Sequence, residues 1–237
     1  MRNLFLFGML LSSVAIAEEP TRLVAFGDST TATRGPLNVY AAVLQKELPA
    51  RQFPVTVINA GVGGHNTDHA RTRFEKDVLA RNPDIVVIQF GINDAAIDVW
   101  KDPPATESRV SLDRYVQNLT DFVQTLKAAQ VRVILMTPNP LQWTPGMRKL
   151  YGKPPYQPDQ STGFNVRLVH YSQKVRELAK TENVPLVDVE RLFEEYGMQD
   201  GKSVDDLLLD GVHPNDSGHR LVADHLMTEL LKLPSAH

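Results

Sequence analysis

The sequence of 237 residues contains no cysteine, so no disulfide can form and no thiol is available for lipid attachment. The fold must therefore be stable through its core alone, which a chain of this length can achieve. Runs of basic residues are also absent, and the formal net charge is −3. We therefore expect no nucleic acid among the partners, because nothing in the sequence could follow a row of phosphates.

No apolar run reaches the roughly 20 residues that a membrane-spanning helix needs. The first 17 residues, MRNLFLFGMLLSSVAIA, instead combine Arg2, a shorter apolar stretch and the small-residue ending Ala15-Ile16-Ala17. This pattern is typical of a secretory signal peptide, and an uncleaved anchor is the alternative. Cleavage after Ala17 predicts one mature domain, residues 18–237, that is secreted or periplasmic and not bound to a membrane.

Five short, β-branched apolar runs recur along the chain. They cover residues 22–26, 55–59, 84–90, 131–137 and 185–189. Such continuous runs suit strands that are covered on both faces of a parallel sheet. Amphipathic segments with helical spacing lie between or after them, at residues 39–48, 69–80, 112–129, 166–182 and 217–233. The alternation predicts a three-layer α/β fold whose five parallel strands follow a flavodoxin-like order, with the active site at their carboxyl ends.

Three irregular segments follow the second, third and fourth predicted strands and should open on the same rim of the sheet. They cover residues 61–67, 91–108 and 138–163. The third is rich in proline and aromatic residues, so we expect an ordered loop that covers the surface rather than a linker. Together the three segments could enclose a ligand.

The stretch GDST, residues 27–30, directly follows the first predicted strand. Ser29 is a candidate nucleophile there, because its hydroxyl can point away from the strand end and its N–H can face a carbonyl. The same residue types are also ordinary in turns and helix caps. Near the other end of the chain, Asp210 and His213 stand three residues apart. That spacing lets a carboxylate orient an imidazole that accepts a proton from Ser29, whereas Asn215 or Asp216 could simply cap the next helix.

An acyl-transfer site also needs donors for an oxyanion, and two of the rim segments contain suitable groups. Gly64 in GVGG offers an unobstructed N–H, and Asn93 in GIND offers a neutral side-chain amide. Each of these loops could instead be a tight turn or a helix cap.

The four motifs GDST, NAGVGG, GIND and DGVH occur in an order that resembles the SGNH (GDSL-type) hydrolases over nearly the whole mature chain. The resemblance implies the SGNH hydrolase fold and a serine esterase that needs no metal or organic cofactor. It also implies that Ser29 is the nucleophile, His213 the general base and Asp210 its orienting acid. The oxyanion hole would comprise the Ser29 N–H, the Gly64 N–H and the Asn93 side chain. Thr30 departs from the common motif, which has leucine there.

The substrate is expected to be a small-molecule or polysaccharide ester. GDST and DGVHPNDSGH are similar to secreted carbohydrate O-acetylesterases such as rhamnogalacturonan acetylesterases, and a rim of amide, hydroxyl and aromatic side chains would favour sugar. The candidate substrate-binding residues are Asn66, Asn139 and Trp143. Two alternatives remain: a lipolytic esterase, lysophospholipase or acyl-thioesterase with an apolar tunnel, and a non-catalytic sugar-binding module.

Two further groups of side chains have more than one interpretation. Trp100, Trp143, Tyr151 and Tyr156 either stack on sugar or cover the core. His65 and His69 stand four residues apart, but no third ligand is near them in the sequence. We therefore expect no metal site.

Overall fold

The computed structural model describes residues 19–233, so the predicted signal peptide, residues 1–17, lies outside the described residues. Five strands form one sheet. They are β1 (Thr21–Gly27), β2 (Val55–Gly61), β3 (Ile85–Gln89), β4 (Arg132–Met136) and β5 (Leu186–Val187). All pairings are parallel, and the strand order is β2-β1-β3-β4-β5. The predicted five-stranded, flavodoxin-like sheet is thereby confirmed.

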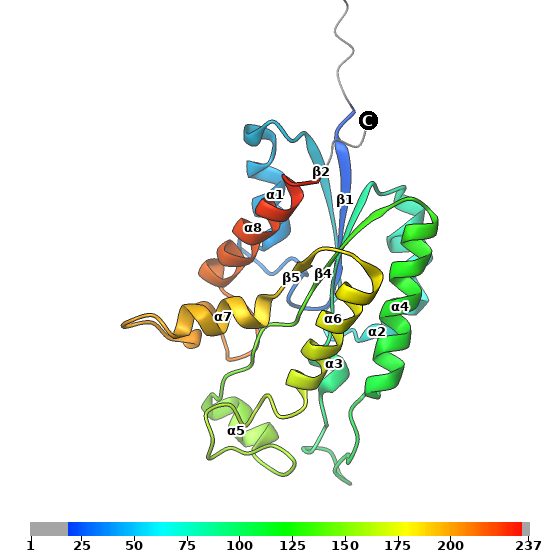
Figure 1. The fold of residues 1–237 in the computed structure, drawn as a ribbon. Coiled ribbons are helices and arrows are strands. Elements are labelled where there is room, and N and C mark those ends of the chain that lie inside the picture. The colour runs from blue at the N-terminus through cyan, green and yellow to red at the C-terminus, as the bar shows by residue number, and fades with distance from the viewer. Residues whose placement is uncertain (1–18, 234–237) are drawn as a thin grey trace, which may run out of the picture.

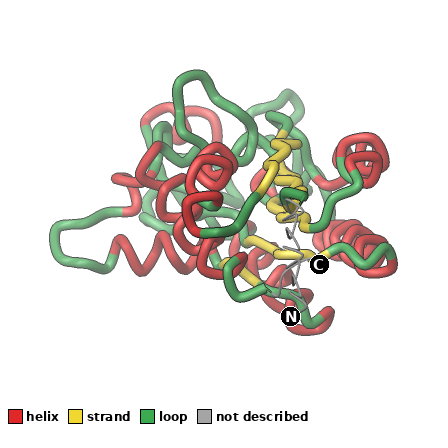
Figure 2. The backbone as a smooth tube through the Cα atoms, turned by 90° about the horizontal axis from the view of Figure 1, so that it is seen from above, coloured by secondary structure: helices red, strands yellow, loops and turns green. Residues whose placement is uncertain are grey.

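Helices cover both faces of the sheet (Figures 1 and 2). One face carries α1 (Tyr40–Glu47), α7 (Val189–Gly197) and α8 (Asp216–Leu230). The other carries α2 (Thr67–Asp77), α4 (Leu112–Ala128) and α6 (Leu168–Glu182). The side chains of β1 alternate between the two cores: Leu23 and Ala25 pack on the first face, Val24 and Phe26 on the second. A strand buried on both sides must be apolar at every position, which explains the continuous run.

Short elements complete the fold at the strand ends. They are α3 (Ile92–Ala95), α5 (Pro145–Tyr151) and the 3₁₀ turns η1 (Pro49–Arg51), η2 (Leu79–Arg81) and η3 (Val204–Leu207). Figure 1 shows α3 and α5 beyond the carboxyl ends of the strands. Neither helix is predicted from periodicity, nor is α7. For α5 a signal was present, because Thr144 caps the helix and Pro145 occupies its first turn.

None of the helices between residues 19 and 233 is long and apolar enough to cross a membrane.

Candidate active site

Ser29 lies in a tight turn at the carboxyl end of β1. The turn is closed by hydrogen bonds from the Thr31 and Ala32 N–H groups to the Asp28 carbonyl, at 3.2 and 3.0 Å. The Asp28 carboxylate accepts from the Thr30 N–H at 2.8 Å and from the Thr30 hydroxyl at 2.9 Å. Asp28 is therefore held inside the turn, and the Ser29 side chain is left free to face His213.

His213 stands between Ser29 and Asp210. Its Nε2 lies 3.0 Å from the Ser29 Oγ, and its Nδ1 lies 2.8 Å from an Asp210 carboxylate oxygen. Asp210 also accepts from the backbone N–H groups of Val212 and His213, at 3.0 and 2.9 Å. Burial would raise the pKa of Asp210, but these hydrogen bonds from His213 and Val212 hold it below its ordinary value. Asp210 therefore stays ionised and fixes the orientation of the imidazole.

The turn that carries this pair is itself anchored on both sides. An isolated β-bridge joins Leu208 to Pro214, and Asn215 caps α8 by accepting from the Gly218 N–H at 3.1 Å. The capping role considered for Asn215 is thus present. Neither Asp210 nor His213 is needed to cap this helix.

The two oxyanion candidates lie on neighbouring loops. Gly64 has a φ of +76°, a left-handed conformation that favours glycine. The Asn93 amide nitrogen donates to the His65 carbonyl at 3.1 Å and makes only a long contact, 3.4 Å, with Asp28. In the described part of the chain, the N–H groups of Ser29 and Gly64 donate no hydrogen bond. Ser29, Gly64, Asn93 and His213 line the same cavity, so all of these donors can reach one bound group.

Arg109 is a residue of this site that the sequence motifs do not identify. Its Nη1 donates to the Asn93 side-chain oxygen at 3.1 Å, while its Nε and Nη2 bind the Asp98 carboxylate at 3.0 and 2.7 Å. Asp98 is buried, and it also pairs with Lys101 at 2.7 Å. Burial would raise the pKa of Asp98, but Arg109 and Lys101 hold it below its ordinary value. Because Arg109 occupies the oxygen of the Asn93 amide, the amide nitrogen must face the other way.

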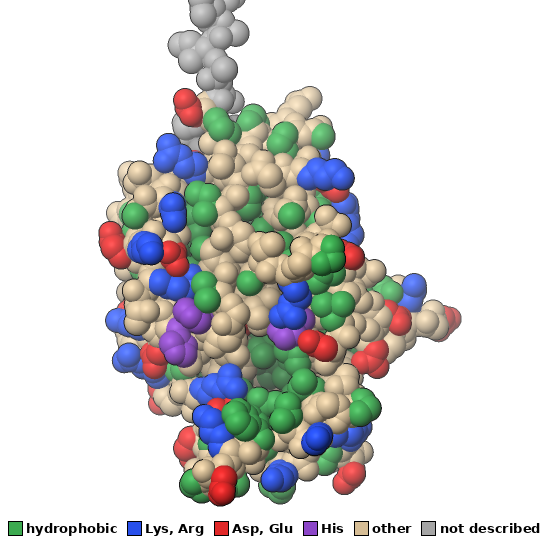
Figure 3. Space-filling model, turned by 180° about the vertical axis from the view of Figure 1, so that it is seen from behind, with side chains coloured by type: hydrophobic (Ala, Val, Ile, Leu, Met, Phe, Trp, Pro, Cys, Tyr) green, Lys and Arg blue, Asp and Glu red, His purple; other side chains and the backbone are tan. Residues whose placement is uncertain are grey.

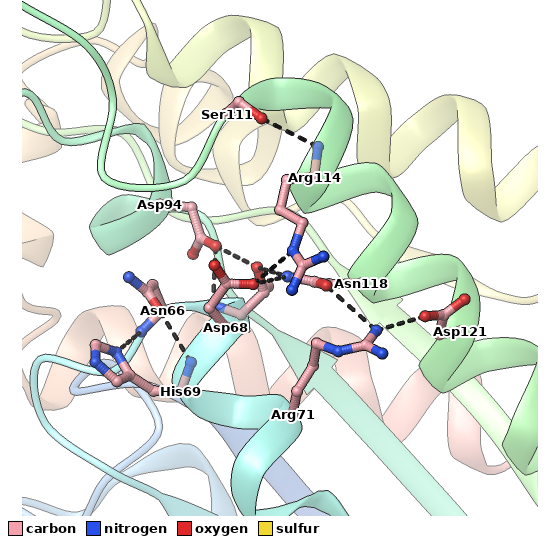
Figure 4. Close-up of polar contacts among 10 residues, drawn as sticks. Asn66, Asp68, His69, Arg71, Asp94, Ser111, Arg114, Asn118 and Asp121 are labelled. Carbon is pink, nitrogen blue, oxygen red and sulfur yellow. Dashed lines mark hydrogen bonds and ion pairs between the residues drawn. The ribbon is translucent and has the colours of Figure 1, made fainter.

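A polar network between α2, α3 and α4 fixes the loops that carry Gly64 and Asn93 (Figure 4). Asp94 accepts from the Thr67 N–H at 2.8 Å and the Thr67 hydroxyl at 2.5 Å. Asn118 of α4 donates to the Thr67 hydroxyl and to Asp68, at 2.9 and 2.8 Å. Burial raises the pKa of Asp94 to about 7, although its hydrogen bonds with Thr67 oppose the shift. The start of α2, just after Gly64, is thereby tied to the residue that follows Asn93.

A cavity of about 420 Å³ opens beside the Ser29 hydroxyl. Its wall is mostly apolar and comes from α3, α5, the start of α6, the loops on both sides of α5 and the turn before His213. The apolar lining residues are Ile92, Ala95, Ala96, Leu141, Met147, Leu150, Tyr151, Tyr156, Phe164, Leu168 and Val212. Figure 3 shows this hollow among green side chains. The prediction of a polar rim is therefore wrong, because the long loop 138–163 turns its apolar side chains inward, onto the site.

The three candidate substrate-binding residues, Asn66, Asn139 and Trp143, are not among the residues that line this cavity. Asn66 is buried and caps α2, accepting from the His69 N–H at 3.1 Å. Asn139 is buried and donates to the Val212 carbonyl at 2.9 Å. Trp143 stacks on Phe164 with ring centroids 4.4 Å apart. All three support the walls of the site, whereas Tyr151 and Tyr156 face the cavity directly.

His65 and His69 lie next to each other, with ring centroids 5.0 Å apart. Between residues 19 and 233, no group of three or more His, Asp or Glu side chains is arranged to hold a metal ion.

Ser29, His213 and Asp210 form a hydrogen-bonded series at the carboxyl edge of the sheet in a three-layer α/β fold. This arrangement is typical of the class of serine hydrolases. Comparison with known proteins gives the family. Residues 25–221 match the GDSL-like Lipase/Acylhydrolase family, and the chain belongs to it. It is a carboxylic ester hydrolase.

Known relatives and solved structures are similar over most of the chain. The chain is 29 % identical to an acetylxylan esterase of Geobacillus stearothermophilus over 76 % of this chain and 74 % of that protein. It is 32 % identical to the uncharacterized lipoprotein YqeF of Bacillus subtilis, over 84 % of this chain and 85 % of that protein. A crystal structure of Axe2, an acetylxylan esterase from Geobacillus stearothermophilus, superposes with a TM-score of 0.69 at 26 % identity. That match covers 89 % of this chain and 94 % of Axe2.

Proposed function

We propose that the protein hydrolyses carboxylic esters through an acyl-enzyme on Ser29. The observation that carries this proposal is the series Ser29, His213 and Asp210, with donor to acceptor distances of 3.0 and 2.8 Å, at the edge of a cavity. Such a series is the arrangement that activates a serine hydroxyl.

His213 Nε2 takes the proton from the Ser29 Oγ as that oxygen attacks the ester carbonyl. The tetrahedral intermediate then collapses, and His213 returns the proton to the leaving alcohol. Water, deprotonated by the same nitrogen, attacks the acyl-enzyme, and the acid leaves as Ser29 regains its proton. Asp210 keeps a proton on Nδ1, so that Nε2 is the nitrogen free to accept one.

The negative charge that develops on the carbonyl oxygen needs donors that are already in place. The Ser29 and Gly64 N–H groups and the second hydrogen of the Asn93 amide are available for this role. None of them has to break a short hydrogen bond first. A donor that is fixed before the reaction costs no reorganisation in the transition state.

The apolar cavity favours, as the substrate, an ester with an apolar acyl or alcohol group. Lipolytic esterases and acyl-thioesterases act on substrates with such groups. The cavity wall would remove such a group from water at roughly 25 cal/mol per Å² of buried area. Carbohydrate O-acetyl esters are the second candidate, which the acetylxylan esterase relatives favour. Export through the signal peptide would place the enzyme outside the cytoplasm, where either kind of substrate could be met.

Two substrate series test this proposal. The kcat/KM for 4-nitrophenyl esters from acetate to decanoate should reach its maximum beyond acetate, and Ala96→Phe, which fills part of the cavity, should move the maximum toward shorter acyl chains. A maximum at acetate, with acetate released from acetylated xylan or pectin, would replace the apolar candidate by the carbohydrate one. Ser29→Ala is the control, and a variant that retained activity on every ester would refute the role of Ser29.

A further inference from the structure

The charged side chains that line the cavity are of one sign. Arg34, Arg109 and Arg167 lie in its wall, and neither aspartate nor glutamate does. The chain as a whole has more acidic than basic residues, with a formal net charge of −3. The cavity therefore differs from the average surface of this protein in the sign of its charge.

The three arginines differ in what balances them. Arg109 is bound to Asp98 through two nitrogens. Within residues 19–233, the guanidinium groups of Arg34 and Arg167 have no ion pair and donate no hydrogen bond. Most other arginines of the described chain do have such partners, as Arg176 does with Asp188 and Glu190. Two cations without ion-pair partners thus remain at a mostly apolar wall.

The two free arginines come from separate parts of the fold. Arg34 is half-buried on the loop that follows the Ser29 turn, and Arg167, which is exposed, immediately precedes α6, next to the lining residue Leu168. Figure 3 shows basic side chains at the rim of the apolar hollow. The half-buried guanidinium of Arg34, beside an apolar wall, attracts an anion more strongly than one surrounded by water, because the lower local dielectric screens the charge less, whereas the exposed Arg167 is more strongly screened.

From this arrangement we infer that the preferred esters carry a carboxylate besides the scissile bond, and that Arg34 or Arg167 binds it while the apolar wall holds the carbon skeleton. The inference rests on the proposed function of the same site and narrows its substrate class. A carboxylate matches one such guanidinium, whose planar fork can donate to both carboxylate oxygens. A neutral sugar ester would leave both cations without a partner.

Two pairs of substrates, whose members differ as a carboxylate and its methyl ester, test this inference. The acyl side is probed with the 4-nitrophenyl monoester of adipic acid and its methyl ester. The alcohol side is probed with 4-acetoxybenzoate and methyl 4-acetoxybenzoate. The measured quantity is the ratio of kcat/KM for the charged member to that for the neutral member, which cancels any general loss of activity. It is determined at low ionic strength for the wild type, Arg34→Gln and Arg167→Gln.

Arg81→Gln is the matched control. Arg81 is exposed at the end of η2, its guanidinium has no partner among the described residues, and it does not line the cavity. The substitution changes the net charge by the same amount. Any long-range effect of charge on substrate encounter will therefore appear in this variant too.

We expect the wild type to prefer the charged member of at least one pair by about 10-fold, as a charge-assisted hydrogen bond provides. The ratio should fall toward one in Arg34→Gln or Arg167→Gln and keep its wild-type value in Arg81→Gln. The inference would be overturned if the wild type preferred the charged member of neither pair. It would also be overturned if both cavity variants retained the preference, or if Arg81→Gln lost it to the same extent. If the wild type hydrolyses neutral esters without preferring charged ones, only this inference fails. If it hydrolyses none of the four, the proposed function fails as well.

Discussion

Replacing Arg109 by lysine should slow the chemical step although Arg109 does not touch the reacting atoms in the proposed mechanism. Lysine keeps the charge but cannot bind Asp98 through two nitrogens and still reach the Asn93 oxygen, 3.1 Å from Arg109 Nη1. Without that bond the Asn93 amide can rotate and present its oxygen to the oxyanion. A hydrogen bond from a charged donor contributes about 1.5–3 kcal/mol, so kcat should fall about 10- to 100-fold. KM for a neutral ester should change little.

Lys101→Gln provides the control, because Lys101 also binds Asp98 but has no contact with Asn93. It should leave kcat within about 2-fold of the wild type, since Arg109 still neutralises Asp98 and the Lys101 side chain is half-exposed. The assay is steady-state hydrolysis of a neutral 4-nitrophenyl ester, with circular dichroism to confirm folding. In a double-mutant cycle, Arg109→Lys should add almost nothing to Asn93→Ala. Additive losses, or a loss in Lys101→Gln as large as in Arg109→Lys, would refute the positioning role of Arg109.

The other predictions concern the proposed triad, the oxyanion hole and a buried acid. Ser29→Ala and His213→Ala should each remain folded and lose orders of magnitude in kcat, and unchanged turnover in either would reject the triad. Asp210→Asn should also lower kcat, through loss of the imidazole tautomer, and a normal pH–rate profile would contradict this. Asn93→Ala should lower kcat by about 100-fold or more with KM nearly unchanged; a rise in KM alone would make Asn93 a binding residue. Burial raises the pKa of Asp94 from 3.8 to about 7, so the folded protein keeps this carboxyl neutral up to nearly pH 7, whereas the unfolded chain ionises it near pH 4. As the pH rises from 4 to 8, the wild type should therefore lose up to about 4 kcal/mol of its free energy of unfolding relative to Asp94→Asn, as measured by urea denaturation. A difference that is independent of pH would contradict the buried carboxyl.

The sheet could be predicted because its signal is local. A strand covered on both faces has to be apolar at every position, and β1 and β3 are continuous runs for that reason. The residues of the proposed triad and the oxyanion candidates could also be named from the sequence, since each belongs to a short motif near the end of a strand or the start of a helix. Parallel strands bring their carboxyl ends to one edge, so residues 184 positions apart, Ser29 and His213, meet at 3.0 Å.

The cavity could not be predicted from such signals, because its lining comes from separate elements that lack a common period. Leu141, Met147 and Phe164 lie in the proline-rich segment between β4 and α6, which includes α5 but whose composition indicates an irregular surface segment. Whether their side chains face the site or the solvent depends on the path of that loop. The path is fixed by contacts such as the bond from the Leu141 N–H to the Asn165 side chain at 2.7 Å. Conversely, polar residues expected at the rim, such as Asn66 and Asn139, are buried and form hydrogen bonds within the protein.

The role proposed for Arg109 could not be predicted from the sequence either. Nothing within several residues of it marks it as functional, and 16 positions separate it from Asn93. Its importance follows from a buried carboxylate, Asp98, which needs a counter-charge in the fold and thereby fixes the guanidinium beside the Asn93 amide. An ion pair that is required for burial can orient a neutral donor without adding an unbalanced charge next to the oxyanion. The arginines that lack such a carboxylate, Arg34 and Arg167, are for the same reason the ones whose charge remains available to a substrate.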